Sequence, residues 1–203
     1  MNPASTSFVL GYHGCDLSLA ERVFAGKKKL ESSLNEYDWL GNGVYFWEHN
    51  ARRAYDFACQ VRDRPHHRGQ RIKRPAVVDA VIDLGNCLNL LDTRAIEMVR
   101  EAHGDLVALL KEAEEPAPTN SGGKDRLLRR LDCAVIEFLH QARDFQREEA
   151  FDSVRAVYTE GEEIYENAGF YAKSHIQLCV RTTACIKGYF RPLDDEGRPI
   201  SFT

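Results

Sequence analysis

The stretch SFVLGYHG (residues 7–14) predicts a β-strand that ends in a glycine turn, because β-forming residues lead directly into Gly14. It places His13 immediately before that glycine, with no apolar partner nearby. Two interpretations are open at this point. Either His13 and Gly14 are ordinary residues of a strand and its turn, or the imidazole and the glycine backbone face a ligand. This stretch alone does not decide between them, so the decision rests on the remainder of the chain.

Two other stretches raise the same question. The first is GNGVYFWE (41–48), in which a glycine-flanked turn leads into a predicted aromatic-rich strand that contains Tyr45. The second is SHIQLCVR (174–181), a predicted strand that begins with polar residues after a long polar loop. Because side chains alternate between the two faces of a strand, His175 and Gln177 lie on the same face. Taken singly, each stretch fits a structural strand better than a site.

The predicted elements place strands at both ends of the chain and helices in the middle, which indicates an α+β fold. A linker of helix breakers, PAPTNSGG (116–123), is expected between the last two helices, and the helix before it is expected to break near Gly104. A polar loop is expected over 27–43. Apolar spacing predicts helices over 18–26, 50–64, 89–115 and 125–146, and further strands over 76–85, 151–160 and 185–192.

Length and composition favour one domain over residues 1–203, with a helical subregion at about 89–146. The net charge of −4 and the pI near 6.0 argue against a broad basic face for duplex DNA. Basic stretches at 27–29, 64–74 and 126–130 each fit a solvated face. A local basic patch also suits an RNA strand or a pyrophosphate group.

The cysteines are scattered along the chain, without a C-x-x-C pair or the spacing of a zinc site, so no metal is expected. The N-terminal MNPASTSF lacks the basic start and the apolar core of a signal peptide. No window approaches the roughly 18 apolar residues of a transmembrane helix. We therefore expect a cytoplasmic protein without a membrane partner, whose cysteines are free and mostly buried.

Neither a G-x-G-x-x-G stretch after a strand nor a P-loop occurs, which argues against the two common nucleotide-binding folds. In order and separation, the three stretches described above instead resemble the ADP-ribosyltransferase superfamily. The likeness is to the branch with a His–Tyr–Glu site and a catalytic fold like that of poly-ADP-ribose polymerases. Members carry Y-H-G on the first core strand, G-x-G-x-Y-F on the next, and an acid or its substitute at the start of a later strand. Here these positions hold His13 with Gly14, Tyr45 and Gln177.

The resemblance implies two small packed β-sheets around a cleft for NAD, which is the substrate, and no metal. It implies that His13 bonds a ribose hydroxyl of the adenosine half and that the Gly14 backbone bonds the nicotinamide amide. Tyr45 would stack on the nicotinamide ring, and the loop that holds Asn35 would lie over the cofactor. Such residues suit the chemistry, because breaking the glycosidic bond of NAD builds positive charge on the ribose.

The third position departs from the family pattern, because Gln177 stands where a glutamate usually supports the cationic transition state. A neutral amide can still hydrogen-bond the ribose but carries no charge. A nearby carboxylate is one source of that charge, and the candidates are Glu48, Glu160, Glu162 and Glu163. A nucleophilic acceptor that needs little help is the other explanation. In the resembling family, the place of His175 often faces the acceptor.

The implied function is transfer of ADP-ribose from NAD to a macromolecular acceptor, a protein or a nucleic acid (RNA or DNA), with release of nicotinamide. By analogy alone, the setting would be a bacterial toxin with an antitoxin partner, or a phage-defence effector. Two alternatives stay open. One is an enzyme like tRNA 2′-phosphotransferase, which needs an arginine cluster such as Arg52, Arg53 and Arg181. The other is a binding module for NAD or ADP-ribose that has lost catalysis, which Gln177 would fit.

Overall fold

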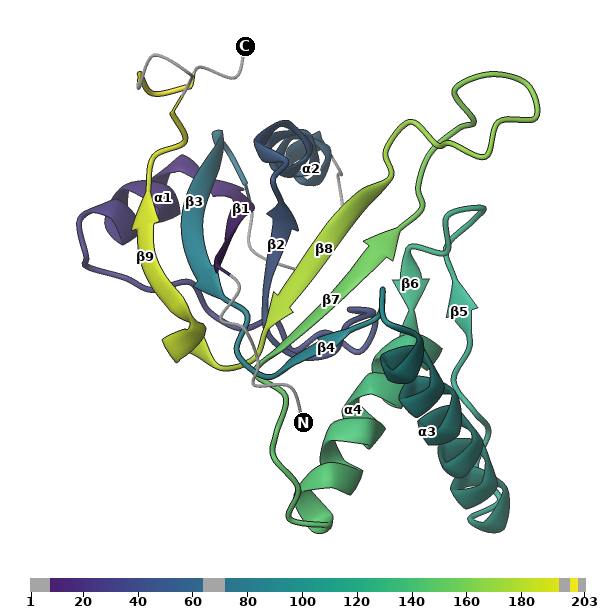
Figure 1. The fold of residues 1–203 in the computed structure, drawn as a ribbon. Helices are drawn as coiled ribbons and strands as arrows, with labels where there is room; N and C mark the ends of the chain where they lie inside the picture. Colours follow the sequence, from purple (N-terminus) through teal and green to yellow (C-terminus); the bar gives the residue numbers. More distant parts are fainter. Residues whose placement is uncertain (1–7, 64–71, 194–197, 201–203) are drawn as a thin grey trace.

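The computed structural model describes residues 8–63, 72–193 and 198–200, which form an α+β fold as the sequence predicts (Figure 1). Most of the basic stretch at 64–74 lies outside the described residues. A seven-stranded mixed sheet in the order β4-β7-β8-β2-β1-β3-β9 forms the centre, and β5 and β6 form a separate ribbon. The elements are β1 (Phe8–Asp16), α1 (Leu17–Phe24), β2 (Val44–Glu48), α2 (Ala51–Asp63), β3 (Pro75–Asp83), β4 (Cys87–Asn89), α3 (Thr93–Glu112), β5 (Asn120–Ser121), β6 (Leu128–Arg129), α4 (Arg130–Phe145), β7 (Ser153–Tyr158), β8 (His175–Val180), the 3₁₀ turn η1 (Thr183–Cys185) and β9 (Ile186–Phe190).

Strand β1 is longer than the sequence predicts. It passes through Gly14 and continues to Asp16, paired with β3 along its whole length, so the predicted glycine turn is wrong. Helix α2 explains why a glycine stands there. A Cβ on Gly14 would lie 2.1 Å from the carbonyl oxygen of Ala54, so the helix packs closely only against a residue without a side chain. Asp16 then caps α1, because its Oδ1 accepts from Ser18 N at 3.0 Å.

The central sheet is only partly joined between β1 and β2. These two strands pair at Gly11↔Glu48 and Tyr12↔Trp47 and then diverge, while β2 stays in register with β8 along Val44–Trp47. The structure therefore has one continuous sheet with a split along this seam, in place of the two packed small sheets that the family resemblance implies. The split leaves backbone groups of both strands facing each other without ladder bonds.

Helices α3 and α4 pack against each other and form the helical subregion, next to β4 in Figure 1. Helix α3 runs unbroken through Gly104, so the predicted break is wrong. An added Cβ at Gly104 would meet nothing within 4 Å, so this glycine lowers helix propensity without a steric role.

Helix α4 begins at Arg130, five residues later than the predicted start at 125. The residues between belong to the β5–β6 ribbon, which also takes up part of the predicted linker. The ribbon supplies the missing cap of the helix, since Asn120 Oδ1 accepts from the backbone N–H groups of Leu131 (3.0 Å) and Asp132 (3.3 Å). Local capping rules cannot predict this cap, because its hydrogen bonds span 11 and 12 residues.

Apolar clusters cover both faces of the central sheet. On one face, α1 packs against alternate residues of β2, β3 and β8, among them the fully buried Phe46. On the other face, α3 and α4 pack against alternate residues of β7 and β8, with Cys179 fully buried. Because side chains alternate, Tyr45 and Trp47 lie on the face opposite Phe46, and Gln177 lies on the face of Cys179.

Within the described ranges, no helix combines the length and the apolar composition needed to cross a bilayer. The six cysteines form no disulfide, and four of them are buried, which agrees with the sequence prediction. Burial raises the pKa of the Cys15 and Cys179 thiols to about 12, so both are unreactive packing residues.

Candidate functional site

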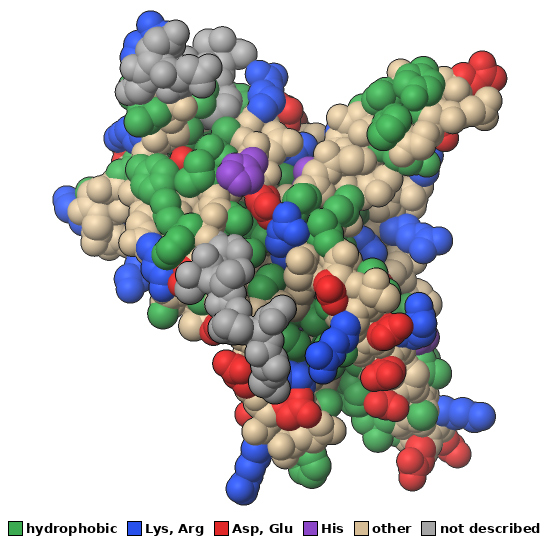
Figure 2. Space-filling view, in the orientation of Figure 1, with side chains coloured by type: hydrophobic (Ala, Val, Ile, Leu, Met, Phe, Trp, Pro, Cys, Tyr) green, Lys and Arg blue, Asp and Glu red, His purple; other side chains and the backbone are tan. Residues whose placement is uncertain are grey.

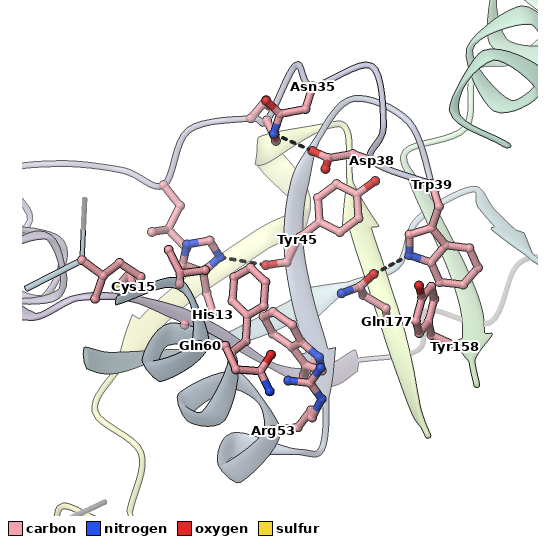
Figure 3. A pocket seen from close by; sticks show the side chains of 18 of the residues that line it. His13, Cys15, Asn35, Asp38, Trp39, Tyr45, Arg53, Gln60, Tyr158 and Gln177 are labelled. Carbon is pink, nitrogen blue, oxygen red and sulfur yellow. Dashed lines mark hydrogen bonds between the residues drawn. The ribbon is translucent and has the colours of Figure 1, made fainter. Parts of the chain in front are cut away.

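A cavity of about 640 Å³ opens where β1 and β2 diverge (Figure 3). Its volume falls within the roughly 300–1,000 Å³ of small-molecule sites. The walls come from the end of β1, the loop before β2, alternate residues of β2 and β8, one side of α2, and residues 127–129 before α4. Six of the predicted site residues line it: His13, Gly14, Asn35, Tyr45, His175 and Gln177.

The His13 side chain takes the place of a backbone donor in the sheet. Alternation along β1 directs the backbone groups of Leu10 and Gly14 toward β2, and His49 N indeed donates to Leu10 O at 3.0 Å. Continued pairing would bring the Gly14 N–H to the Tyr45 carbonyl oxygen. His13 Nδ1 lies 2.8 Å from that oxygen instead. The backbone N–H and C=O of Gly14 are therefore directed into the split, where the cavity lies.

The same contact fixes the protonation of His13. A carbonyl oxygen only accepts, so Nδ1 carries the proton and Nε2 keeps its lone pair. Burial lowers the pKa of the imidazole, while the bond to the Tyr45 carbonyl opposes that effect. The ring is therefore neutral at pH 7, and its remaining polar atom is a hydrogen-bond acceptor.

Tyr45 combines a structural hydroxyl with a ring that lines the cavity. The hydroxyl donates to Gly41 O at 2.8 Å and accepts from Leu40 N at 3.0 Å, so it fastens the turn before β2. Burial raises the pKa of Tyr45 well above its usual value, which keeps the phenol neutral. The hydroxyl is thus committed to the fold, and the aromatic face is what a ligand can use.

Gln177 is held in one orientation by Trp39. The indole Nε1–H lies 2.5 Å from Gln177 Oε1, and an indole nitrogen can only donate, so the contacting atom must be the amide oxygen. The Gln177 NH₂ group consequently points away from Trp39 (Figure 3). Trp39 and Gln177 are 138 residues apart, so no local signal in the sequence pairs them.

Trp39 is itself fixed by residues from the helical subregion and from β7. Its ring packs edge-on against Tyr158, with centroids 5.0 Å apart, and the Arg129 guanidinium lies 4.5 Å from its centroid. Arg129 also pairs with Asp132. The segment just before α4 therefore builds one wall of the cavity. Sequence reasoning missed this role because the basic stretch at 126–130 also fits a solvated face.

The loop before β2 brings a carboxylate to the cavity. Asn35 Nδ2 donates to Ser33 Oγ at 2.7 Å and to Asp38 Oδ2 at 3.2 Å, so the amide orients the carboxylate. Figure 3 shows Asp38 between Asn35 and Tyr45. Burial raises the pKa of Asp38, against the lowering effect of its bonds to Ser33 and Asn35.

The structure does not bring Glu48 or Glu163 to the cavity wall. Glu48 follows Tyr45 by three residues and so faces away from it, where its carboxylate pairs with Arg155 at 2.6 and 2.8 Å. Glu163 is exposed in the loop before β8. Glu160 does line the cavity, buried in an ion pair with Arg53 at 2.6 Å. Of the carboxylates named from the sequence, Glu160 is therefore the one that lines the cavity.

The comparisons leave the family open. No family model matches the chain, and no solved structure matches it. The chain is similar to the uncharacterized protein MJ0359 of Methanocaldococcus jannaschii. The two are 24% identical over 193 residues, which cover 87% of this chain and 83% of that protein. That name states no activity, so a functional proposal rests on the cavity itself.

The arginine cluster that a 2′-phosphotransferase needs is not assembled from the three predicted residues. Arg52 is exposed and pairs with Asp56 at 3.0 Å, and Arg181 pairs with Glu137 at 2.5 Å; neither lines the cavity. Arg53 alone of the three reaches it. In the described part of the chain, no group of three or more His, Cys, Asp and Glu side chains is arranged to hold a metal ion.

Proposed function

We propose that this protein is an NAD-dependent ADP-ribosyltransferase, which moves ADP-ribose from NAD to a macromolecular acceptor and releases nicotinamide. One observation carries the proposal: His13, Gly14, Tyr45 and Gln177, from three strands, converge on a single cavity at the β1–β2 split. These are the residues to which the family resemblance assigns NAD. The order of the three stretches in the sequence does not by itself require these residues to line the same cavity.

The chemistry of each group suits a part of NAD. The Gly14 N–H and C=O point the same way and match the acceptor and donor of the nicotinamide amide. The Tyr45 ring offers a flat surface for the nicotinamide. His13 Nε2 accepts from a ribose hydroxyl of the adenosine half. All three interactions exist in the ground state, so they contribute to NAD affinity.

Catalysis requires stabilisation of the positive charge that develops on the ribose as the glycosidic bond of NAD breaks. The bond between ribose C1′ and the nicotinamide nitrogen breaks, and its electron pair leaves with nicotinamide. Gln177, oriented by Trp39, donates its N–H to a hydroxyl of the nicotinamide ribose and so positions the reacting sugar. The negative charge that Gln177 lacks comes from Asp38, which lines the same cavity, because Arg53 already balances the charge of Glu160.

Binding and cleavage of NAD by the purified protein test this function. Calorimetry measures NAD affinity, and release of labelled nicotinamide measures cleavage. We expect Gln177→Ala to lose about a hundredfold in rate, because it removes the oriented contact to the reacting ribose. His140→Ala is the control, because His140 bonds a backbone carbonyl as His13 does but lies on α4 outside the cavity. Binding without any cleavage by the wild type would favour the inactive module instead.

A further inference from the structure

Helix α4 is largely covered by the rest of the chain. No residue of the stretch 131–140 is exposed, because α3 packs against the helix and the loop before β2 also contacts it. Many charged side chains of the helical subregion lie on its outer surface instead (Figure 2). Glu137 is an exception, since its side chain is only 21% exposed. A carboxylate in such a place needs partners within the fold.

Three residues spaced by four attach the loop before β2 (residues 33–43) to α4. Arg129 immediately precedes the helix, and Cys133 and Glu137 follow on the same face. Arg129 N donates to Tyr37 O at 3.3 Å, Cys133 Sγ donates to Asn35 O at 3.6 Å, and Glu137 Oε1 accepts from Asn42 N at 2.8 Å. The loop therefore lies along this face, and the attached part of it holds Asp38 and Trp39.

Glu137 makes the most hydrogen bonds of the three. Besides the backbone bond, its Oε2 accepts from Asn42 Nδ2 at 2.9 Å, and both carboxylate oxygens accept from Arg181, at 2.5 and 3.3 Å. Arg181, just after β8, also donates to Asn42 O at 3.1 Å. Burial raises the pKa of Glu137, but the bonds from Arg181 and Asn42 outweigh it and hold the pKa below its usual value. These three residues, the Glu137 clamp, join α4, the turn before β2 and the end of β8.

The glycines on either side of Asn42 make room for the clamp and for β8. Gly41 has a φ of +79°, and an added Cβ would lie 2.3 Å from Glu137 Oε1. An added Cβ on Gly43 would lie 2.5 Å from Cys179 Sγ. Neither glycine lines the cavity, and the clamp does not line it either. The turn therefore serves the attachment of the loop to α4 and β8, and it acts on a ligand only through its neighbours.

The neighbours of the clamp do line the cavity. Gly41 N donates to Asp38 O at 2.8 Å, and Gly41 O accepts from the Tyr45 hydroxyl at 2.8 Å. Trp39, two residues before Gly41, donates to Gln177. A shift of the turn would therefore move the Asp38 carboxylate and separate Trp39 from Gln177. The Tyr45 ring is held independently, because β2 stays paired with β8 at this point.

We propose that Glu137 is a positioning residue of the candidate site, which keeps Asp38 and the Trp39–Gln177 pair in the geometry that the reaction needs. The inference rests on the proposed function. It gives a part in catalysis to the helical subregion, which lies outside the three stretches that carry the family resemblance. Glu137 acts through these residues and contacts no substrate itself.

The clamp supports the reaction rather than the binding of NAD. Asp38 and Gln177 act on the charge and position of the reacting ribose, and both depend on the clamped loop. His13 and Gly14, which hold NAD in the ground state, lie on β1 and are fixed by β3 and α2. Loss of the clamp should therefore lower the rate at saturating NAD and leave NAD affinity unchanged.

The test compares Glu137→Ala with Asn42→Asp, which keeps the Glu137–Arg181 pair but sets a second carboxylate against Glu137. Both changes release the turn. We expect nicotinamide release at saturating NAD to slow roughly tenfold in each variant, the worth of one oriented hydrogen bond. NAD affinity measured by calorimetry should stay at the wild-type value. Asn42→Asp is isosteric and lies in a turn, so it decides the test if Glu137→Ala does not fold.

A second readout needs no NAD. The chain has two tryptophans, so the labelled protein gives two indole N–H signals in NMR. The Trp39 signal reports the bond to Gln177 and should shift in both variants. The Trp47 signal is the internal reference, because Trp47 Nε1 has no hydrogen-bond partner among the described residues. A merely structural role of Glu137 would lower the free energy of unfolding without moving the Trp39 signal or the rate of the folded protein.

Glu48→Ala is the matched control, because it also removes a carboxylate that accepts two hydrogen bonds from an arginine, Arg155. It should lower the free energy of unfolding without changing the rate or the Trp39 signal. An unchanged rate or Trp39 signal in Asn42→Asp, a loss of rate that only follows weaker NAD binding, or the same Trp39 shift in Glu48→Ala would overturn this inference alone. A wild-type protein that binds no NAD would overturn the proposed function, and the catalytic role of the clamp with it.

Discussion

The His13 imidazole donates to the Tyr45 carbonyl oxygen across 2.8 Å, at the point where β1 and β2 stop pairing. A side chain thus occupies the ladder position that the Gly14 N–H would otherwise fill. The sheet remains continuous while one glycine backbone is turned toward a cavity. A single residue therefore links the split in the sheet to the chemistry of the site.

The first prediction concerns this substitution of a side chain for a backbone donor. His13→Ala frees the Tyr45 carbonyl, so the Gly14 N–H can bond it and close the seam. We expect NAD affinity to fall at least about tenfold, which corresponds to roughly 1.4 kcal/mol. The Gly14 amide should also exchange its hydrogen more slowly in the variant. Unchanged affinity and exchange would show that His13 does not hold the seam open.

The second prediction concerns the bond from Trp39 to Gln177. Trp39→Phe keeps an aromatic ring against Tyr158 but removes the N–H, so the amide is free to rotate. We expect about tenfold slower nicotinamide release, the worth of one oriented hydrogen bond. In a Gln177→Ala background the same change should have no further effect, because the two residues act as one unit. Additive losses in the double variant would mean that Trp39 acts by another route.

The third prediction contrasts two glycines. Gly14→Ala would place a Cβ 2.1 Å from Ala54 O, so α2 must move away from β1. We expect a loss of about 2 kcal/mol or more in the free energy of unfolding, measured in urea. Gly104→Ala, in the open interior of α3, should stabilise by about 0.5–1 kcal/mol. Equal effects at the two sites would contradict the close packing of α2 on β1.

The fourth prediction concerns the dependence of stability on pH. Burial raises the pKa of Asp79 from 3.8 to about 6, so the folded state favours the neutral carboxyl. Ionisation of this carboxyl therefore lowers the free energy of unfolding. The loss grows as the pH rises from about 4 to 6 and is fully present above pH 6. Asp79→Asn should stabilise by about 1–2 kcal/mol at pH 8 and by less at pH 5. A gain that is the same at both pH values would rule out this titration.

Local patterns predicted the fold where neighbours in sequence decide it. The aromatic-rich strand predicted within 41–48 is β2, and the helix predicted over 50–64 is α2 within one residue at each end. The end of β1 was mispredicted, because its pairing with β3 outweighs the local turn preference of Gly14. The start of α4 was missed for a similar reason, since its cap comes from Asn120 on β5.

The candidate site was predicted in part for the same physical reason. Side chains alternate along a strand, so the residues that share a face can be identified from the sequence. The same rule places Glu48 on the face opposite Tyr45, away from the cavity. The bonds between Trp39 and Gln177 and between Arg53 and Glu160 span more than a hundred residues. Only the folded chain brings such partners together, so no spacing rule could have found them.

The most direct test of the NAD site is a titration of the isotope-labelled protein with NAD, followed by NMR. The backbone amide of Gly14 and the side-chain NH₂ of Gln177 should shift together and saturate at one NAD concentration. The amide of Gly104, outside the cavity on α3, should not move. If NAD saturates the protein while the Gly14 and Gln177 signals stay in place, or if no signal shifts, the cavity at the β1–β2 split is not an NAD site.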